Sequence, residues 1–304
     1  MLELSGLNLN AEGLSRIAAG ESVSLNTAAL ASVSENRSVI DRILAEGRTV
    51  YGINTGFGQF ATVVIPPDQL QQLQLNLIRS HAAGVGEPLP QDQTRALMAA
   101  RINCLLRGHS GIGPEPIHLL AACLNKNVLP VVPSQGSVGA SGDLAPLAHM
   151  ALLLVGEGLA WRDGRQVPGG EALRAEGLEP IQLEAKEGLA LINGTQLITS
   201  LGCLALQRLR DLTALADEIA ALSLEALRGS RSPFDPRIHA ARPHPGQIEV
   251  AANLRRILGP TSEIADSHRD CHRVQDAYSL RCRPRCMGSP ATRCVSLARS
   301  WSGN

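Results

Sequence analysis

Lysine is scarce in this sequence, and neither sign of charge predominates. Only two of the 28 basic residues are lysines, Lys126 and Lys186, so a reaction that depends on lysine has just these two candidates. Acidic residues also number 28, and the resulting net charge of zero gives no indication of a nucleic acid or an anionic membrane as partner. We therefore expect neither of them among the partners of the chain.

Long apolar runs and a secretory signal are also missing. No uncharged apolar run reaches the roughly 18 to 20 residues of a membrane span. The N-terminal residues MLELSGLNLN contain no basic stretch followed by an apolar one. The seven cysteines are an odd number scattered over helix-like segments, which is typical of reduced thiols and unlike a disulfide framework. Together these absences predict a cytoplasmic protein.

Apolar residues recur at helical spacing through most of the chain. One amphipathic pattern follows Asn26, a residue type that commonly caps a helix N-terminus, and continues to Gly47. A much longer pattern runs from about Thr195 to Arg228 and includes charged positions. It predicts an amphipathic rod that needs helical neighbours, rather than a membrane span. The other predicted helices lie at about residues 67–82, 92–107, 114–126 and 144–156.

These patterns predict a mainly α fold in three parts. Residues 1–110 form a mixed, loop-rich helical region, and residues 111–285 contain the long helix and the beginning of a long-helix bundle. Residues 286–304 form a tail in which helical periodicity is lost. From residue 281 onward the chain has five arginines and no acidic residue. Such a composition is typical of a basic surface tail, and a shifted reading frame would also produce it.

Residues 136–143, GSVGASGD, place three glycines within seven positions just before an apolar run. Because glycine costs backbone entropy on folding, this cluster indicates close backbone approach or unusual dihedral angles. A dinucleotide fingerprint, a phosphate loop and a nucleophile elbow each need a different spacing or ending. A tight turn and a chemically reactive segment remain as explanations. We expect Asp143 to cap the helix that follows.

Ala140, Ser141 and Gly142 have the residue types that a backbone cyclisation requires. The amide nitrogen of Gly142 can attack the carbonyl carbon of Ala140 and close a five-membered ring, while Ser141 loses its hydroxyl group and becomes an exocyclic methylene. Small flanking side chains permit the compression of consecutive backbone atoms that this closure needs. Ring closure and dehydration each release one water, and the product is a strong electrophile made from the chain itself.

The stretch GSVGASGDLAPLAHM, which contains this tripeptide, resembles the self-cyclising segment of the aromatic amino acid ammonia-lyases. Those enzymes form a methylidene-imidazolone prosthetic group (MIO). The resemblance implies an ammonia-lyase/fumarase-like fold, MIO formed from Ala140, Ser141 and Gly142, and a homotetramer whose bundle assembles each active site from several subunits. It implies neither a metal nor pyridoxal phosphate.

Two further motifs resemble segments that carry the family's catalytic residues. YGINTGFG begins at Tyr51 and resembles the tyrosine loop, so Tyr51 corresponds to the catalytic base. The ordinary pKa of tyrosine, about 10, has to be lowered for that role. LINGTQ, residues 191–196, resembles the asparagine motif, so Asn193 corresponds to the residue that contacts the cyclised group and the reacting amine.

A third motif, VQDAYSLR, resembles the family segment with a glutamine, a tyrosine and a carboxylate-binding arginine. The corresponding residues here are Gln275, Tyr278 and Arg281, and Tyr278 is one of only two tyrosines in the chain. On a helix each step of three residues turns by about 300 degrees, so the three side chains would share an arc of about 120 degrees.

RSHAAGVG, residues 79–86, resembles the segment that selects the substrate. A Ser-His pair at this point accompanies the histidine-specific members, so Ser80 and His81 imply L-histidine as substrate. The products are then trans-urocanate and ammonia, in the first step of histidine degradation. A phenylalanine or tyrosine ammonia-lyase, or an aminomutase of the same family, is the alternative among enzymes. A helical interaction module is the non-enzymatic alternative, and it predicts no cyclisation.

Two other chemistries match the residues less well. A pyridoxal phosphate lyase needs a Schiff-base lysine and a phosphate cup, and neither lysine lies in such a context. A zinc site drawn from His268, Cys271, His272 and Cys282 has a spacing that fits no common zinc pattern, so we expect no metal.

The resemblance extends to about Arg281 and is lost by Ser289. Family members continue with more of the helical bundle, including a phenylalanine and a glutamate of the pocket. The motifs therefore predict a C-terminally truncated member with an aberrant tail.

Overall fold

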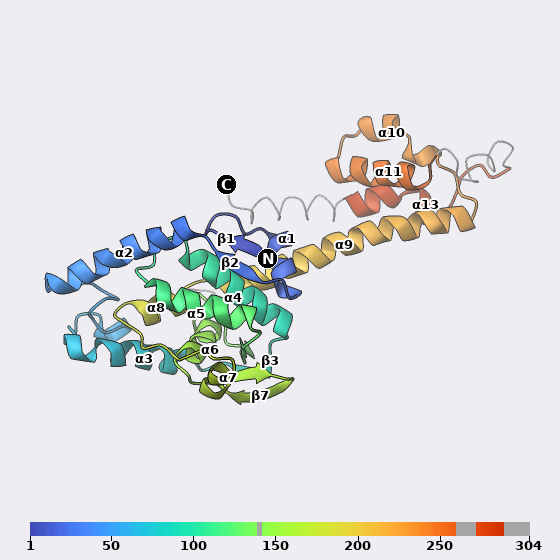
Figure 1. The fold of residues 1–304 in the computed structure, drawn as a ribbon. Coiled ribbons are helices and arrows are strands. Elements are labelled where there is room, and N and C mark those ends of the chain that lie inside the picture. The colour runs from blue at the N-terminus through green and yellow to red at the C-terminus, as the bar shows by residue number, and fades with distance from the viewer. Residues whose placement is uncertain (139–141, 260–271, 289–304) are drawn as a thin grey trace. The chain divides into compact units, whose positions relative to one another are not determined.

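The computed structural model describes residues 1–138, 142–259 and 272–288 (Figure 1). The chain divides into two compact units, Met1–Leu204 and Ala205–Asn304. Helices dominate the described residues, and the strands there are only two to four residues long. The prediction of a mainly α fold is therefore confirmed.

The helices predicted from apolar periodicity are present. Asn26 caps α2, since its Oδ1 accepts the N–H of Ala29 at 3.0 Å. The predicted rod is α9, which is 31 residues long. The bounds of these helices are α2 (Thr27–Ala45), α3 (Leu70–His81), α4 (Gln91–Leu105), α5 (Pro114–Asn125), α6 (Leu144–Leu154) and α9 (Gln196–Ala226).

Shorter helices that the periodicity did not predict complete the fold. Most of them are short, and α8 with six residues and α13 with four have too few turns for a clear apolar stripe. Helix α11, with thirteen residues, was missed although it is as long as helices that were predicted. Their bounds are α1 (Ala11–Ala18), α7 (Gly169–Ala175), α8 (Glu187–Ile192), α10 (Pro236–Ala240), α11 (Pro245–Ile257) and α13 (Tyr278–Arg281).

The core of the first unit lies between α4, α5, α6 and α8. Helix α4 packs against α1 and α5, while α6 packs against α3 and α8. The apolar side chains at this centre have no exposed surface; examples are Leu97, Ile102, Leu120, Leu147 and Leu191. Burial of this apolar area is the main driving force for folding of the unit.

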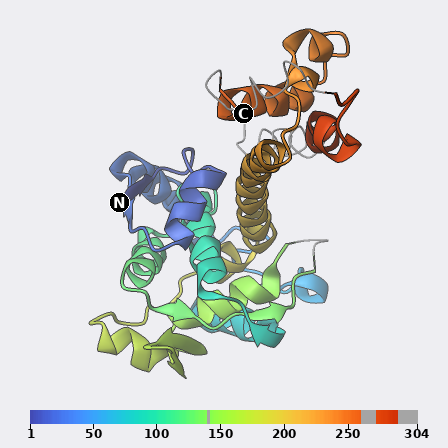
Figure 2. The same cartoon turned by 90° about the vertical axis from the view of Figure 1, so that its right-hand side faces the viewer.

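Three small sheets fasten the loops of the first unit. The β4–β6–β7 sheet lies beside α7 at the lower edge of the unit in Figures 1 and 2. Strand β1 pairs with β2 in parallel, and the other pairs are antiparallel. The strands are β1 (Leu2–Leu4), β2 (Val23–Leu25), β3 (Val85–Pro88), β4 (Leu129–Pro130), β5 (Pro133–Gln135), β6 (Leu159–Arg162) and β7 (Arg165–Pro168).

The second unit has a much smaller core. Part of α9 packs with α11 and the turn before α10, and the buried side chains are Ala221, Leu224, Phe234, Val250, Leu254 and Leu258. Other leucines and isoleucines of α9 are exposed, among them Leu209, Leu212, Leu215, Ile219 and Leu222.

By length and composition, the helical stretch Glu187–Ala226 is apolar enough to cross a membrane. The core helix of a globular protein meets the same criterion, and the first part of this stretch is built into the core through Leu191, Ile192 and Leu197. Burial in a protein core thus accounts for the apolar character of that part.

Candidate active site

Tyr51 lies on the loop between α2 and α3, and its side chain is 57% exposed. Its ring meets that of Phe57 edge to face, with 6.1 Å between the centroids and 78° between the planes. Asn54 closes the loop, since its Oδ1 accepts the N–H of Val50 at 2.9 Å and its Nδ2 donates to the carbonyl of Arg48 at 2.8 Å. The loop is therefore held internally while the tyrosine side chain stays accessible.

The tyrosine loop packs against α8, the helix that leads to Asn193. At Gly52 the backbone has φ +77°, and a Cβ there would lie 2.8 Å from a methyl carbon of Leu189 and 3.6 Å from Nζ of Lys186. Burial lowers the pKa of Lys186. Glycine thus allows the residue next to Tyr51 to touch α8.

Ser80 and His81 lie at the C-terminal end of α3. The Ser80 hydroxyl donates to the carbonyl of Leu77 at 2.9 Å, and Nδ1 of His81 lies 2.8 Å from the same oxygen. Because a carbonyl oxygen can only accept, Nδ1 carries a proton, and a neutral ring then presents the lone pair of Nε2 outward from this bond.

The segment RSHAAGVG lies against the glycine-rich segment through the β3–β5 pair. A Cβ at Gly136 would lie 3.2 Å from the Cα of Gly84. The N–H of Gly84 donates to Nε2 of His149 on α6 at 3.1 Å, and burial lowers the pKa of His149. The structure thus joins two motifs that are about fifty residues apart in the sequence.

Gly142 lies against the asparagine motif. Its φ is +122°, and a Cβ at this position would lie 2.6 Å from the carbonyl oxygen of Gly194. Any residue other than glycine would therefore be strained and would also clash with backbone. Ala140 and Ser141 lie outside the described residues, so the structure describes one end of the predicted cyclising tripeptide.

Asp143 does not cap the helix that follows it, contrary to the expectation from the sequence. No hydrogen bond joins its side chain to the first turn of α6. Its carboxylate instead accepts the N–H of Ile198 at 3.0 Å and the hydroxyl of Ser137 at 2.5 Å, and its own N–H donates to Gly194 at 2.7 Å. Asp143 therefore ties the glycine-rich segment to the first turn of α9, because the free N–H groups there attract a carboxylate.

Asn193 follows the last residue of α8, and its side chain is exposed. Its carbonyl accepts a hydrogen bond from Nη2 of Arg101 at 3.1 Å. Arg101 also donates through Nη1 to Oε1 of Gln196 at 2.6 Å and through Nη2 to the carbonyl of Ala190. The sequence motifs did not identify Arg101. A charged residue inside the apolar helix pattern of α4 was the only available signal.

The residues of the third motif lie in the second unit. Tyr278 and Arg281 are the first and last residues of α13, and Tyr278 is 70% exposed. Gln275 precedes this helix, so the predicted common helical arc does not apply to it. Nη1 of Arg281 nevertheless donates to Oε1 of Gln275. Both residues line a cavity of about 330 Å³, together with Ser230, Ser232, Pro233, Ile238, Arg273, Val274 and Asp276.

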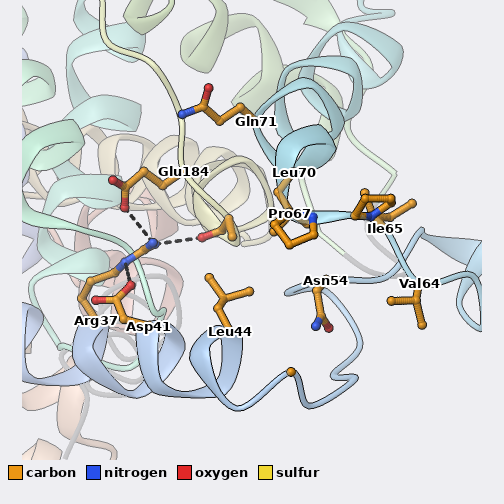
Figure 3. Close-up of a pocket in the computed structure, with 13 residues that line it drawn as sticks. Arg37, Asp41, Leu44, Asn54, Val64, Ile65, Pro67, Leu70, Gln71 and Glu184 are labelled. Carbon is orange, nitrogen blue, oxygen red and sulfur yellow. Dashed lines mark hydrogen bonds and ion pairs between the residues drawn. The ribbon is translucent and has the colours of Figure 1, made fainter.

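A larger cavity of about 550 Å³ lies in the first unit, between α2, the tyrosine loop and α3 (Figure 3). Arg37 on its wall donates to Asp41 at 3.1 Å and to Glu184 at 2.7 Å. None of the predicted site residues that the structure describes lines this cavity; its walls include Arg37, Asp41, Leu44, Asn54, Val64, Ile65, Pro67, Leu70, Gln71 and Glu184. Arg37 is the cation among these described lining residues, and its guanidinium is already paired with two carboxylates.

Glu187 is a buried acid beside this cluster. Its carboxylate accepts the N–H groups of Gly113 at 2.9 Å and Glu184 at 2.8 Å, and Nη1 of Arg37 lies 3.9 Å away. Burial nevertheless raises the pKa of Glu187. The network anchors the start of α8, at the other end of which Asn193 lies.

In the described part of the chain, no group of three or more His, Cys, Asp or Glu side chains is arranged to hold a metal ion. Of the four residues considered above as a zinc site, two lie outside the described residues, namely His268 and Cys271.

Known proteins resemble this chain over most of its length. The family model described as aromatic amino acid lyase matches residues 9–301, which includes most of the tail that the motifs left outside the resemblance. A histidine ammonia-lyase of Koribacter versatilis is 53% identical over 88% of this chain and 52% of its own length. The human histidine ammonia-lyase is 51% identical over 94% of this chain and 44% of its own length.

Solved structures give the same result. A histidine ammonia-lyase from Trypanosoma cruzi superposes with a TM-score of 0.87 at 42% identity, covering 98% of this chain and 55% of that chain. A tyrosine aminomutase from Streptomyces globisporus superposes with a TM-score of 0.89 at 36% identity, covering 99% and 60%. The chain spans about half the length of the curated relatives it matches. It belongs to the aromatic amino acid lyase family.

Proposed function

We propose that this chain carries the site of an ammonia-lyase that converts L-histidine to trans-urocanate and ammonia without oxidation. The observation that carries the proposal is the contact between Gly142 and Gly194, because it leaves no room for a Cβ at one end of the Ala-Ser-Gly tripeptide. This contact confines one end of the tripeptide, which favours the compression of consecutive backbone atoms that formation of MIO from Ala140, Ser141 and Gly142 requires. Identities above 50% to two proteins named histidine ammonia-lyase support histidine as the substrate.

The proposed base is Tyr51, which takes a proton from the β carbon of the substrate. This proton is weakly acidic, so its removal needs a strong base, and a tyrosine phenolate is such a base. The exposure of Tyr51 supports this role, since the phenol oxygen must reach a bound substrate.

The leaving group and the carboxylate need separate residues. MIO, once formed, supplies an electrophile that takes up the substrate amine, which makes ammonia easier to expel. Asn193 at the end of α8 and Tyr278 at the start of α13 orient that amine in the proposal. Arg281, held by Gln275, binds the substrate carboxylate through its guanidinium group.

Ser80 and His81 are assigned to substrate selection. Nδ1 of His81 is engaged by the Leu77 carbonyl, so Nε2 of the neutral ring can accept a hydrogen bond from the imidazole N–H of the substrate. A phenyl ring has no such donor, and an acceptor left unpaired would disfavour it. The phenolic hydroxyl of tyrosine is a donor, and the likeness to a tyrosine aminomutase makes tyrosine the second candidate substrate.

We also propose a homotetramer in the cytoplasm, with no metal, no pyridoxal phosphate and neither a nucleic acid nor a membrane as partner. The apolar stripe of α9, which includes Leu212, Leu215, Ile219 and Leu222, supports an assembly because long helices bury such a stripe against neighbours. Free cysteines in the described residues support a reducing compartment; they are Cys104, Cys123, Cys203, Cys282 and Cys286.

The test follows urocanate formation from L-histidine by its ultraviolet absorbance. Any turnover by the unaltered protein should be lost in Ser141→Ala, because alanine has no hydroxyl group to eliminate. Intact mass gives an independent measure, since cyclisation removes two waters from the unaltered chain and none from the variant. Activity that survives Ser141→Ala would contradict the mechanism, and turnover of tyrosine but not histidine would contradict the substrate.

A further inference from the structure

Helix α4 carries two buried arginines, Arg95 and Arg101, and Arg101 is only 2% exposed. Its guanidinium donates to the carbonyls of Ala190 and Asn193 and to the side chain of Gln196. Among the described residues its hydrogen-bond acceptors are all uncharged, and its Nε has no hydrogen-bond partner. A buried cation without a counter-ion is costly, so its three acceptors must offset much of this cost.

All three acceptors belong to one short segment. Ala190 lies in the last turn of α8, Asn193 ends that helix, and Gln196 begins α9. Arg101 therefore spans the break between two helices, where backbone carbonyls have lost their helical partners. Burial lowers the pKa of Arg101 to about 10, which still leaves the group positively charged at neutral pH.

The same segment contacts the cyclising tripeptide. A Cβ at Gly194 would clash with Nη1 of Arg101, so the loop backbone lies directly against the guanidinium. The carbonyl of Gly194 accepts the N–H of Asp143 at 2.7 Å and limits the space at Gly142. A continuous series of contacts thus runs from Arg101 through Gly194 to Gly142.

We propose that Arg101 is a positioning residue for MIO formation, because it holds the backbone of the 193–196 loop at the place where the Gly194 carbonyl confines Gly142. The effect of Arg101 on cyclisation rests on the proposed function. The effect of Arg101 on the position of the loop does not, and it can be measured whether or not the chain cyclises.

The test compares Arg101→Met with Arg95→Met in the full 304-residue chain. Arg95 is the control because it is 6% exposed on the same helix and also donates only to uncharged acceptors, namely three carbonyls, those of Ile17, Glu21 and Leu124, and one amide oxygen, that of Asn127. None of these acceptors lies in the 193–196 loop. Each variant loses a buried arginine, and only one loses contact with the loop.

The first readout is the intact mass, which gives the fraction of chains that have lost two waters. At equal distance below the melting temperature, we expect Arg101→Met to lower the cyclisation rate by about tenfold or more and Arg95→Met to leave it unchanged. Arg101→Lys retains the cation and one donor and should recover part of the rate. An equal loss in Arg95→Met, or an unaltered rate in Arg101→Met, would overturn the proposal.

The second readout is amide hydrogen exchange at Asp143 and Ile198, measured in the same proteins. We expect exchange at both amides to quicken by about tenfold in Arg101→Met and to stay near the unaltered value in Arg95→Met. If the unaltered chain loses no water, the proposed function fails, and exchange alone then decides whether Arg101 positions the loop. If Arg101→Met does not fold, Arg101→Lys and Gln196→Leu take its place, and unchanged exchange in both overturns the proposal.

Discussion

The two units of the chain differ in how they bury apolar surface. The first unit has one continuous core, in which Leu97, Leu120 and Leu147 have no exposed surface. The second has a small cluster around Phe234, while Leu222 on its long helix is 69% exposed. Because buried apolar area is the main driving force for folding, the first unit is stabilised by its own core, whereas α9 has an apolar face left over for further packing.

The same difference separates the two groups of candidate site residues. Gly142 and Asn193 are positioned by contacts between elements far apart in the sequence. Gln275 and Arg281 are joined by a local contact six residues apart. The first group is therefore built by tertiary packing, and its geometry should respond to changes in the core much more than that of the second group.

The largest expected effect is in the first core. Leu147→Ala should lower the free energy of unfolding by about 2–5 kcal/mol, because it removes buried methyl groups and leaves a cavity. Leu215→Ala on the exposed face of α9 should change it by no more than about 0.5 kcal/mol. Chemical denaturation measures both. Equal effects would contradict the contrast between the units.

The next effect concerns the glycine that contacts Gly194. Gly142→Ala should cost about 3 kcal/mol and abolish the loss of two waters, because φ +122° is strained for alanine and its Cβ meets the Gly194 carbonyl. Gly164→Ala is the matched control, since Gly164 has φ +74° and open space around it. It should cost about 1 kcal/mol from backbone strain alone. Denaturation and intact mass of both variants check the prediction.

A smaller effect is expected in how the free energy of unfolding depends on pH, because a buried acid and an exposed acid change it in opposite directions. Burial raises the pKa of Glu187 above its ordinary 4.5, so the folded state binds this proton more tightly than the unfolded state. Its contribution to stability is fully present below pH 4.5 and is lost as the pH rises through the raised value. Glu187→Gln should therefore flatten the decline in stability above pH 4.5 in a denaturation series.

Asp235 in the second unit should behave in the opposite way. Its hydrogen bond with the Arg237 side chain lowers its pKa from 3.8 to about 2, so its contribution is present above pH 3.8 and is lost as the pH falls through about 2. Asp235→Asn should remove only this acid-side loss. A Glu187→Gln variant that changes stability only at acidic pH, or an Asp235→Asn variant that changes it only above pH 4.5, would contradict these pKa directions.

The smallest effect on stability is expected on the apolar stripe of α9. Leu222→Ser should change the free energy of unfolding by no more than about 0.5 kcal/mol, since its side chain is largely exposed. It should nevertheless reduce self-association, measured by sedimentation, because a serine cannot contribute to an apolar interface. A substitution of Ile198, which lies on the same helix in the first unit, is the control. It shows whether the reduction in self-association is confined to the apolar stripe.

Local patterns were sufficient to predict the longer helices and the residues of the motifs. The apolar repeat of α2 and its Asn26 cap lie within a few residues of one another, and the same holds for the long helix α9. Short helices such as α8 carry too few turns for such a repeat. The domain boundaries predicted at residues 110 and 285 stay predictions, while the structure divides the chain after Leu204.

The partners of individual polar groups could not be predicted. Asp143 was expected to bond to the helix beside it and instead bonds to Ile198, 55 residues away. Arg101 lies 92 residues from Asn193, and Arg37 lies 147 residues from Glu184. No local spacing connects such pairs, because their distances depend on how whole helices pack.

By itself, then, the sequence determined the mainly helical character of the chain, the positions of its long helices and the chemical identity of the Ala-Ser-Gly tripeptide. Only the tertiary structure decided that the carbonyl of Gly194 confines Gly142 and that a buried arginine holds the same loop. The physical reason is the sequence separation over which each feature is determined. Helical periodicity depends on neighbours three or four residues apart, whereas a steric contact between two glycines requires that separate helices, packed on a common core, bring their ends together.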